Sequence, residues 1–190
     1  MIDIKNNSYN HSINQLTELE PKWFAVYTKY KCEKFVAGQL DKKNIEVYVP
    51  LVTRVKKYQR KKKVFEVPLI NCYVFVKIKK QDYIRTLETD HVLKFLRQGK
   101  DLIAIPNEEI DLLKRVVGDV EVSINSSDFS FDFGEDVEVA SGHLAGMKGK
   151  IVSKSGKKSF IVELETIGYQ LRIKIDLENL RSIQKEKLIA

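Results

Sequence analysis

The stretch VEVASGHLAGMKGKI, residues 137–151, decides the fold of the C-terminal part of this chain. Its two valines alternate with charged residues, as in a half-buried strand, and an isoleucine resumes the apolar pattern after three glycines. Glycines at this spacing suit a tight loop that needs positive φ or close backbone approach. The motif positions are Val137, Val139, Gly142, Leu144, Gly146, Gly149 and Ile151. The pattern predicts strand, loop and strand; taken alone, it also fits a glycine-rich hairpin in an unrelated small barrel.

The residues that follow this motif continue as strands. Residues 159–164 and 169–175 alternate apolar with polar side chains, and a short apolar segment covers 180–183. With the strands around the glycine loop, this makes about five strands and no helix. We therefore predict an all-β, SH3-like small barrel over residues 133–185, and the alternation in 169–175 indicates strand alone.

The first half of the chain mixes strand and helix periods. Residues 22–28 (KWFAVYT) and 72–78 (CYVFVKI) are apolar on both faces, which is typical of covered strands. Residues 31–43 carry a helical stripe of Cys32, Phe35, Val36 and Leu40. Further strands are expected at 45–52, 64–69, 92–96 and 102–105, and helices at 82–87 and 107–117. This order predicts an α/β (α+β) domain over 22–118, with a central, mainly antiparallel sheet flanked by helices; Trp23 and Phe95 are expected in its core.

The net charge of +7 is unevenly distributed. Residues 22–118 hold 22 Lys and Arg against 11 Asp and Glu, whereas residues 133–190 hold 10 against 8. Residues 119–132 contain four acidic residues and no basic one, which is typical of a linker. Residues 1–21 form a polar segment that we expect to be a flexible tail. The basic character therefore belongs to the first domain, where it favours a nucleic-acid partner.

Several classes of protein are disfavoured by the sequence. Cys32 and Cys72 are too few for a disulfide framework or a four-thiolate site, and the three histidines show no ligand spacing. We expect no metal and no cofactor. No phosphate-binding glycine loop, nucleophile triad or carboxylate pair stands out, so an enzyme is not expected. The chain shows neither a membrane span nor a signal peptide, which predicts a cytoplasmic protein.

Residues 54–63 (RVKKYQRKKK) hold seven basic residues in ten, at the position of a hairpin between two strands. Such a loop repels itself and attracts phosphate, and Tyr58 could stack on a base. The alternative is a solvated charged face without a ligand. The basic candidates in this loop are Arg54, Lys56, Lys57, Arg60, Lys61, Lys62 and Lys63.

Four segments together resemble the NusG family of transcription factors. They are KWFAVYTKYKCEKFVAGQL, PLINCYVFVKI, VLKFLRQG and FGEDVEVASGHLAGMKGKI, in family order over about residues 22–185. The last resembles a KOW motif, and the first three resemble parts of an NGN domain. The chain is most similar to specialised paralogues of the RfaH and UpxY type, which regulate operons such as those for capsular polysaccharide. Asn71-Cys72-Tyr73 replaces the usual Pro-Gly-Tyr or Pro-Asn-Tyr of the family.

The resemblance implies elongation or antitermination activity without catalysis. It implies that the first domain binds the clamp helices of RNA polymerase, with Tyr27, Tyr73 and Phe75 on the docking face. Packing of these rings under a helix is the alternative. The basic hairpin, with Lys29, Lys31 and Lys34 at the start of the first helix, would face upstream DNA or the non-template strand. The KOW domain would contact a ribosomal protein, a termination factor or RNA, and the protein would be a monomer.

Two other functions compete with this interpretation. The first is an RNA-binding or ribosome-associated KOW protein with an unrelated α/β domain. The second is an interaction module whose barrel recognises peptides. Binding to core polymerase would separate all three.

Overall fold

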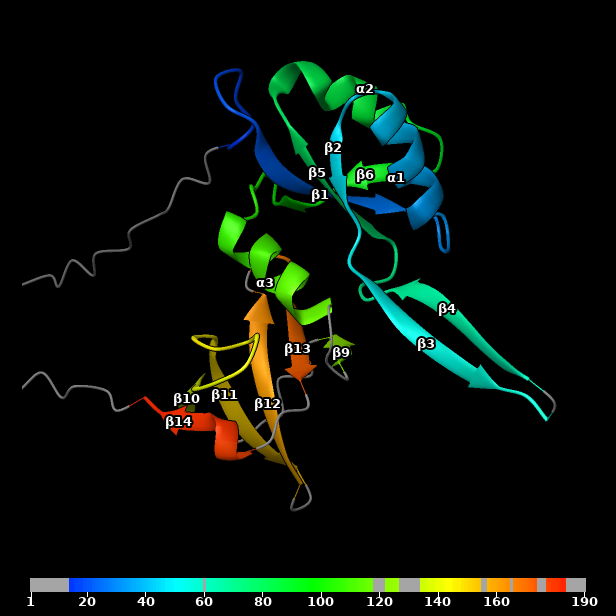
Figure 1. The fold of residues 1–190 in the computed structure, drawn as a ribbon. Coiled ribbons are helices and arrows are strands. Elements are labelled where there is room, and N and C mark those ends of the chain that lie inside the picture. The colour runs from blue at the N-terminus through cyan, green and yellow to red at the C-terminus, as the bar shows by residue number, and fades with distance from the viewer. Residues whose placement is uncertain are drawn as a thin grey trace, which may run out of the picture.

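A computed structural model describes residues 14–59, 61–117, 122–126, 134–154, 157–164, 166–173 and 177–183. Figure 1 shows an α/β unit at the top, a β unit below it and a helix, α3 (Asn107–Val117), at their boundary. This arrangement confirms the predicted fold class. In the described residues, no helix is long and apolar enough to cross a membrane.

The upper unit is built on a four-stranded antiparallel sheet in the order β2-β5-β1-β6. Its strands are β1 (Lys22–Thr28), β2 (Glu46–Tyr48), β5 (Tyr73–Ile78) and β6 (Val92–Phe95). Helices α1 (Glu33–Lys42) and α2 (Tyr83–Leu87), with the short η1 (Lys80–Asp82), cover one face. The central strands lie between apolar layers, as their two-sided apolar pattern predicts.

The alternation along β1 and β5 assigns their side chains to two separate clusters. Phe24, Val26 and Val74 pack with α1, whereas Trp23 and Phe75 pack on the opposite face with α3. The predicted core positions Trp23 and Phe95 are 4% and 2% exposed, which confirms them.

The helical stripe of α1 was predicted only in part. Val36 and Leu40 are fully buried, but Phe35 is 46% exposed. Its ring contacts that of His91, with centroids 5.2 Å apart. The helix buries a narrower face than its apolar residues suggest, because only one side of α1 meets the sheet.

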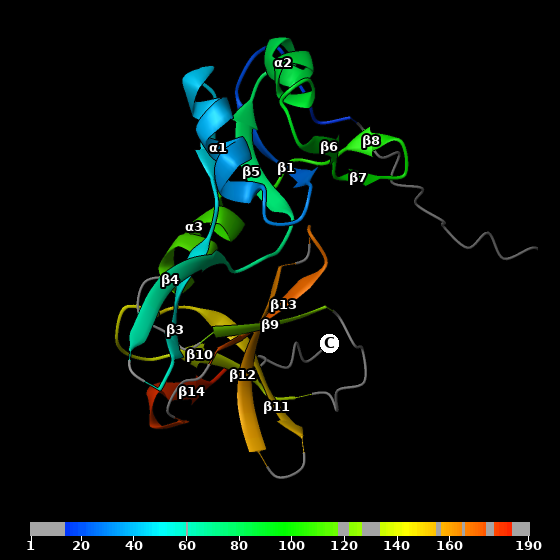
Figure 2. The same cartoon turned by 90° about the vertical axis from the view of Figure 1, so that its right-hand side faces the viewer.

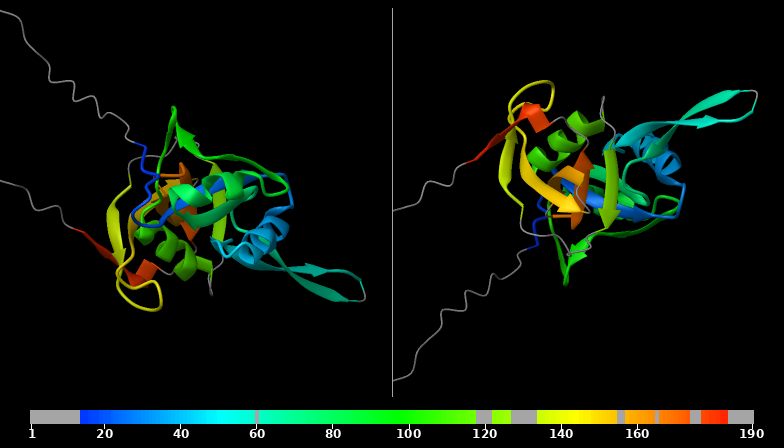
Figure 3. Two further views of the ribbon diagram at one scale, coloured as in Figure 1. Left: turned by 90° about the horizontal axis from the view of Figure 1, so that it is seen from above. Right: turned by 90° about the horizontal axis from the view of Figure 1, so that it is seen from below.

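The expected strand over 45–52 is divided in two. β2 ends at Tyr48, and β3 (Leu51–Lys57) begins after Pro50, which has no N–H for a ladder and a fixed φ. β3 pairs with β4 (Lys62–Pro68) in a two-stranded hairpin. Figures 1 and 3 show this hairpin extending away from the rest of the molecule, and in Figure 2 it points toward the viewer.

A second, smaller hairpin joins β7 (Arg97–Gln98) to β8 (Asp101–Leu102). The strand expected over 102–105 therefore ends early; Ile105 makes only an isolated bridge with Trp23. The described part of the N-terminal segment lies on this region, since Gln15 N–H donates to the Leu102 carbonyl (3.0 Å). Of residues 1–21, where we expect a flexible tail, residues 1–13 lie outside the described residues.

The lower unit is a six-stranded antiparallel sheet in the order β14-β10-β11-β12-β13-β9. The expected barrel strands are β10 (Asp136–Val139), β11 (Lys148–Lys154), β12 (Lys157–Leu164), β13 (Tyr169–Ile173) and β14 (Leu180–Ser182), with one helical turn, η2 (Leu177–Asn179). The sixth strand, β9 (Val122–Ser126), lies in the range expected to be a linker. It pairs antiparallel with β13 from Tyr169↔Ser126 to Ile173↔Val122.

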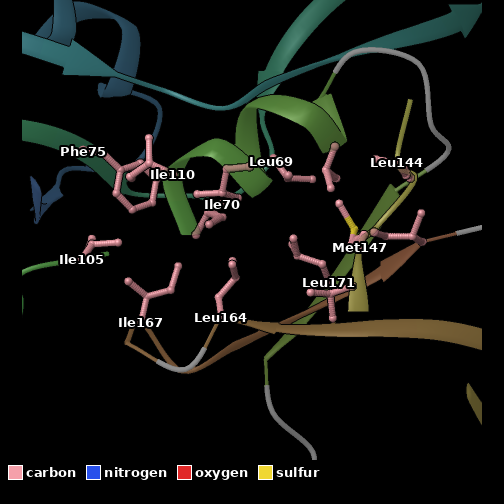
Figure 4. Packing of buried hydrophobic residues seen from close by; sticks show 14 of the residues in the cluster. Leu69, Ile70, Phe75, Ile105, Ile110, Leu144, Met147, Leu164, Ile167 and Leu171 are labelled. Atoms are coloured by element: carbon pink, nitrogen blue, oxygen red, sulfur yellow. The ribbon is translucent and has the colours of Figure 1, made fainter. Parts of the chain in front are cut away.

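The two units share one hydrophobic cluster (Figure 4). From the upper unit it contains Phe75 and Ile105, from α3 Ile110, and from the lower unit Leu164 and Leu171. All five are at most 3% exposed. The domains are therefore in direct contact through α3 in this structure.

Candidate functional site

The three aromatic residues expected at a docking face lie beside the contact between the units. Tyr27 and Tyr73 are half-buried, with their ring centroids 5.3 Å apart in an edge-on arrangement. The ring of Tyr73 also packs edge-on against that of Tyr169 on β13, with the two ring centroids 5.8 Å apart. Phe75 is fully buried in the shared cluster. In this arrangement Tyr27 and Tyr73 are partly exposed to solvent, whereas Phe75 packs beneath α3.

The environment of these rings changes their acidity. Burial raises the pKa of Tyr73 to about 12, with a smaller effect of the neighbouring Tyr169 hydroxyl. Burial also raises the pKa of Tyr48, which lies beside Phe75, to about 12. The pKa of Tyr27 is raised chiefly by its electrostatic interaction with Cys72 and next by a hydrogen bond with that side chain. All three tyrosines are neutral at physiological pH.

Two polar side chains of α3 bind loops of the lower unit. The Arg115 guanidinium donates to the carbonyl of Ala145 (2.8 Å) and, through Nε and Nη2, to that of His143 (3.3 and 3.2 Å). Near the other end of α3, Glu109 Oε1 accepts from Thr166 N–H (3.1 Å) and from its hydroxyl (2.8 Å). The contact between the units is therefore specific at both ends of the helix.

The glycine motif forms the loop that Arg115 binds. Val137, Val139 and Leu144 are 1–3% exposed, and Gly142 and Gly146 have φ of +82° and +81°. Gly149 is needed for another reason: a Cβ there would lie 2.5 Å from the Ile161 carbonyl oxygen. The seventh position, Ile151, is partly buried against the shared cluster. The structure thus gives each glycine of the motif a physical requirement, as in a KOW segment.

The basic hairpin is exposed along its length. Arg54, Lys56, Lys61, Lys62 and Lys63 are all exposed, whereas Arg60 and the side chain of Lys57 lie outside the described part of the chain. The register places Lys56 directly opposite Lys63. Like charges in this position destabilise a ladder, so the hairpin tip holds cations close together at a cost.

The start of α1 lies next to the hairpin. Lys29, Lys31 and Lys34 are exposed. Lys34 Nζ is 3.1 Å from a carboxylate oxygen of Glu66 on β4, which joins the two basic elements. Both side chains are at least half exposed, so this pair fixes geometry more than stability.

Sequence reasoning missed the residues that connect the two units. Glu109 and Thr166 are 57 positions apart, and Tyr169 was expected only as an inward residue of a barrel. An acidic residue in the first turn and an arginine in the last turn of α3 also suit the helix dipole, so neither points to a partner. The strand β9 had a signal, because Val122 and Ile124 alternate with polar residues.

Nothing in the described residues indicates a metal or redox site. No group of three or more His, Cys, Asp or Glu side chains is arranged there to hold a metal ion. Cys32 and Cys72 are free and half-buried. The described surfaces offer two features suited to binding. One is the row of aromatic rings of Tyr27, Tyr73 and Tyr169, and the other is the basic hairpin.

These features define a class of protein in which an α/β unit with a projecting basic hairpin is followed by a small β unit with a glycine loop. Comparison with known families makes the class specific. Residues 21–114 match the family described as "NusG: Transcription termination factor nusG". This part of the chain is similar to the NGN domain of the NusG family, and the β-rich region after it is consistent with a KOW domain.

One solved structure supports the fold, and two others share a lower structural similarity with this chain. The structure described as "Domain interaction in Thermotoga maritima NusG" is 18% identical, with a TM-score of 0.52 over 88% of this chain and 99% of that one. Conformations A and B of an MjSpt4:Spt5 complex are 19% and 20% identical, over 86% and 87% of this chain and 99% of each of theirs, at a TM-score of 0.30. Comparison with curated protein sequences gave no match.

Proposed function

We propose that the protein is a transcription elongation and antitermination factor that binds RNA polymerase through its N-terminal unit. Tyr27 and Tyr73 are the proposed contacts with the clamp helices of the polymerase. Tyrosine buries a large area at low entropic cost and keeps a polar group for a partner. The single observation that carries the proposal is this pair of half-exposed tyrosines in a NusG-family domain.

Phe75 was expected beside the two tyrosines on the docking face. Because Phe75 is fully buried, we propose that it supports their rings from below. Direct contact between Phe75 and polymerase would require α3 to move away.

The proposed mechanism is binding without catalysis. A factor that holds both sides of the polymerase cleft favours the elongating state only if it binds that state more tightly than the paused one. Pausing and termination would then decrease in proportion to this difference in affinity.

The lower unit limits access to the proposed docking face. Tyr169 packs against Tyr73, and Glu109 and Arg115 fasten the lower unit to α3. We propose that the units separate when polymerase binds, so that contacts within the protein compete with contacts to the enzyme. The description of Thermotoga maritima NusG as a case of domain interaction supports this proposal.

The proposed nucleic-acid contacts lie on the hairpin and the start of α1. There the exposed lysines Lys29, Lys31 and Lys34 join the basic residues of 54–63. Their charge supports binding to upstream DNA or to the exposed non-template strand. In the KOW region, exposed Lys148 and Lys150 support the second candidate function, RNA binding without polymerase. A ribosomal protein or termination factor is the other proposed partner of that region.

Specialisation for particular operons is the finer part of the proposal. It rests on the resemblance to UpxY and RfaH-type factors, including Asn71-Cys72 before the central strand, and polysaccharide operons are the proposed targets. The Cys72 residue adopts φ +64°, and its N–H donates to the buried Glu33 carboxylate at 2.7 Å. We propose a monomer that acts in the cytoplasm.

The test is transcription by purified polymerase on a template with a known pause. The protein is expected to shorten the pause, and Tyr73→Ser, once shown to be folded, is expected to act less. An exposed lysine on η1 provides the control: Lys80→Gln is expected to act as wild type. If the wild-type protein binds RNA but leaves the pause unchanged, the second candidate function replaces this one.

A further inference from the structure

The two faces of the β3–β4 hairpin differ in chemistry. Directly opposite residues of an antiparallel pair have their side chains on the same face, and faces alternate along a strand. The register pairs Arg54 with Phe65 and Lys56 with Lys63. Tyr58 belongs to the same side, since Lys56 Nζ lies 5.4 Å from its ring centroid. We call this set of five residues the basic-aromatic face.

The opposite face has a different composition. Its central pair is Val55 with Val64, which are 55% and 63% exposed. Nearer the body of the protein, Glu66 is engaged by Lys34 of α1. Lys62 is the described lysine of this face, next in sequence to Lys63. The two faces therefore separate lysines that are neighbours in sequence.

Charge and aromatic rings coincide on the basic-aromatic face. Tyr58 and Phe65 are 47% and 36% exposed, and both lie beside cationic side chains of the same face. Lys56 and Lys63 repel each other across the ladder, and a bound polyanion would relieve that repulsion. Exposed rings between cations are what a nucleic-acid strand with accessible bases requires.

We propose that the basic-aromatic face binds single-stranded nucleic acid, with phosphates on Lys56 and Lys63 and bases stacked on Tyr58 and Phe65. Tyr58 directly follows β3, and Phe65 lies opposite Arg54 of β3. Four residues of extended chain separate these two levels by about 13 Å, so each ring takes a separate base. Bases in a duplex are already stacked and cannot reach such rings. This inference rests on the nucleic-acid contact within the proposed function and adds the strand state, the face and Phe65.

The test is fluorescence anisotropy of labelled oligothymidylate, either single-stranded or annealed to its complement, with the full-length protein. Tyr58→Ala and Phe65→Ala are each expected to weaken single-strand binding by roughly 5- to 150-fold and duplex binding much less. An oligouridylate arm shows whether RNA binds by the same residues. Phe65→Leu keeps the hairpin apolar while removing the ring, and is used if Phe65→Ala changes the circular dichroism spectrum.

The charge control uses the neighbouring lysines. Lys63→Gln should lower the slope of log affinity against log salt by about 0.7, whereas Lys62→Gln, with the same loss of charge on the other face, should change it less. Equal effects of the two lysine variants, or single-strand binding unaffected by loss of either ring, would overturn the proposal. Polymerase binding should be unchanged in all five variants. The proposed polymerase contact is tested separately by Tyr73→Ser, so the two proposals can fail independently.

Discussion

Removal of one hydroxyl is expected to loosen the contact between the two units. Glu109 Oε1 accepts two hydrogen bonds from Thr166, and among the described residues its other oxygen, Oε2, is buried without a partner. Thr166→Val keeps the shape of the side chain and the backbone donor, and deletes only the hydroxyl at 2.8 Å.

The size of the effect follows from the charge on the acceptor. A hydrogen bond to a charged group contributes about 1.5–3 kcal/mol, so the closed arrangement should lose a factor of roughly 10 to 150 in its equilibrium constant. If polymerase binds only the open form, its apparent affinity should rise by up to that factor. The gain in apparent affinity ends once most of the protein is in the open form, in which the two units are separated.

The assay measures core polymerase binding and small-angle X-ray scattering on the same samples. Thr166→Val should bind polymerase more tightly and show a larger radius of gyration than wild type. Thr53→Val, the same change at an exposed position of the hairpin, is the control and should alter neither. A Thr166→Val protein that is more expanded but binds polymerase no better would refute the idea that domain contact competes with docking.

Two further predictions concern the glycines and the buried tyrosines. Gly149→Ala should destabilise the β unit by about 1–3 kcal/mol in thermal unfolding, because the new Cβ would lie 2.5 Å from a carbonyl oxygen and 2.7 Å from the Phe160 ring. Gly38→Ala, in α1 with open space around it, should instead stabilise by about 0.5–1 kcal/mol; unchanged melting in both would contradict the packing account. Tyr48 and Tyr73, each with a pKa raised to about 12, should appear as a late step when phenolate absorbance is followed against pH. Their contribution to stability is full below the unfolded pKa of about 10 and is lost as the pH rises towards 12, so a single titration step near 10 in the folded protein would count against it.

Much of the local structure could be predicted from alternation and glycine spacing. The two faces of β1 and β5 follow from residues 22–28 and 73–78, because side chains in a strand alternate strictly. The loop of the KOW-like motif follows from Gly142 and Gly146, since their positive φ is costly for other residues. These features depend on neighbours in sequence, which is why one sequence suffices to predict them.

The arrangement of the two units could not be predicted in the same way. The alternation of β13 showed that Tyr169 faces inward but not that it meets Tyr73 of the other unit. Acidic composition suggested a linker over 119–132, yet β9 completes a sheet there by pairing with a strand more than forty positions later. Phe35 was predicted to be buried but is exposed. A helical stripe identifies the apolar positions of a helix, but it does not show how much of that face the sheet covers.

Binding of core RNA polymerase tests the central claim most directly. The comparison is made in the Thr166→Val background, so that the contact of Tyr73 with Tyr169 does not complicate the result. Tyr73→Ser should weaken binding by about 30-fold or more, as expected for a hot-spot aromatic. Tyr30→Ser, the same change at a 65% exposed tyrosine of the same unit, should bind as the parent does. Equal binding by a folded Tyr73→Ser protein would contradict the proposed docking face.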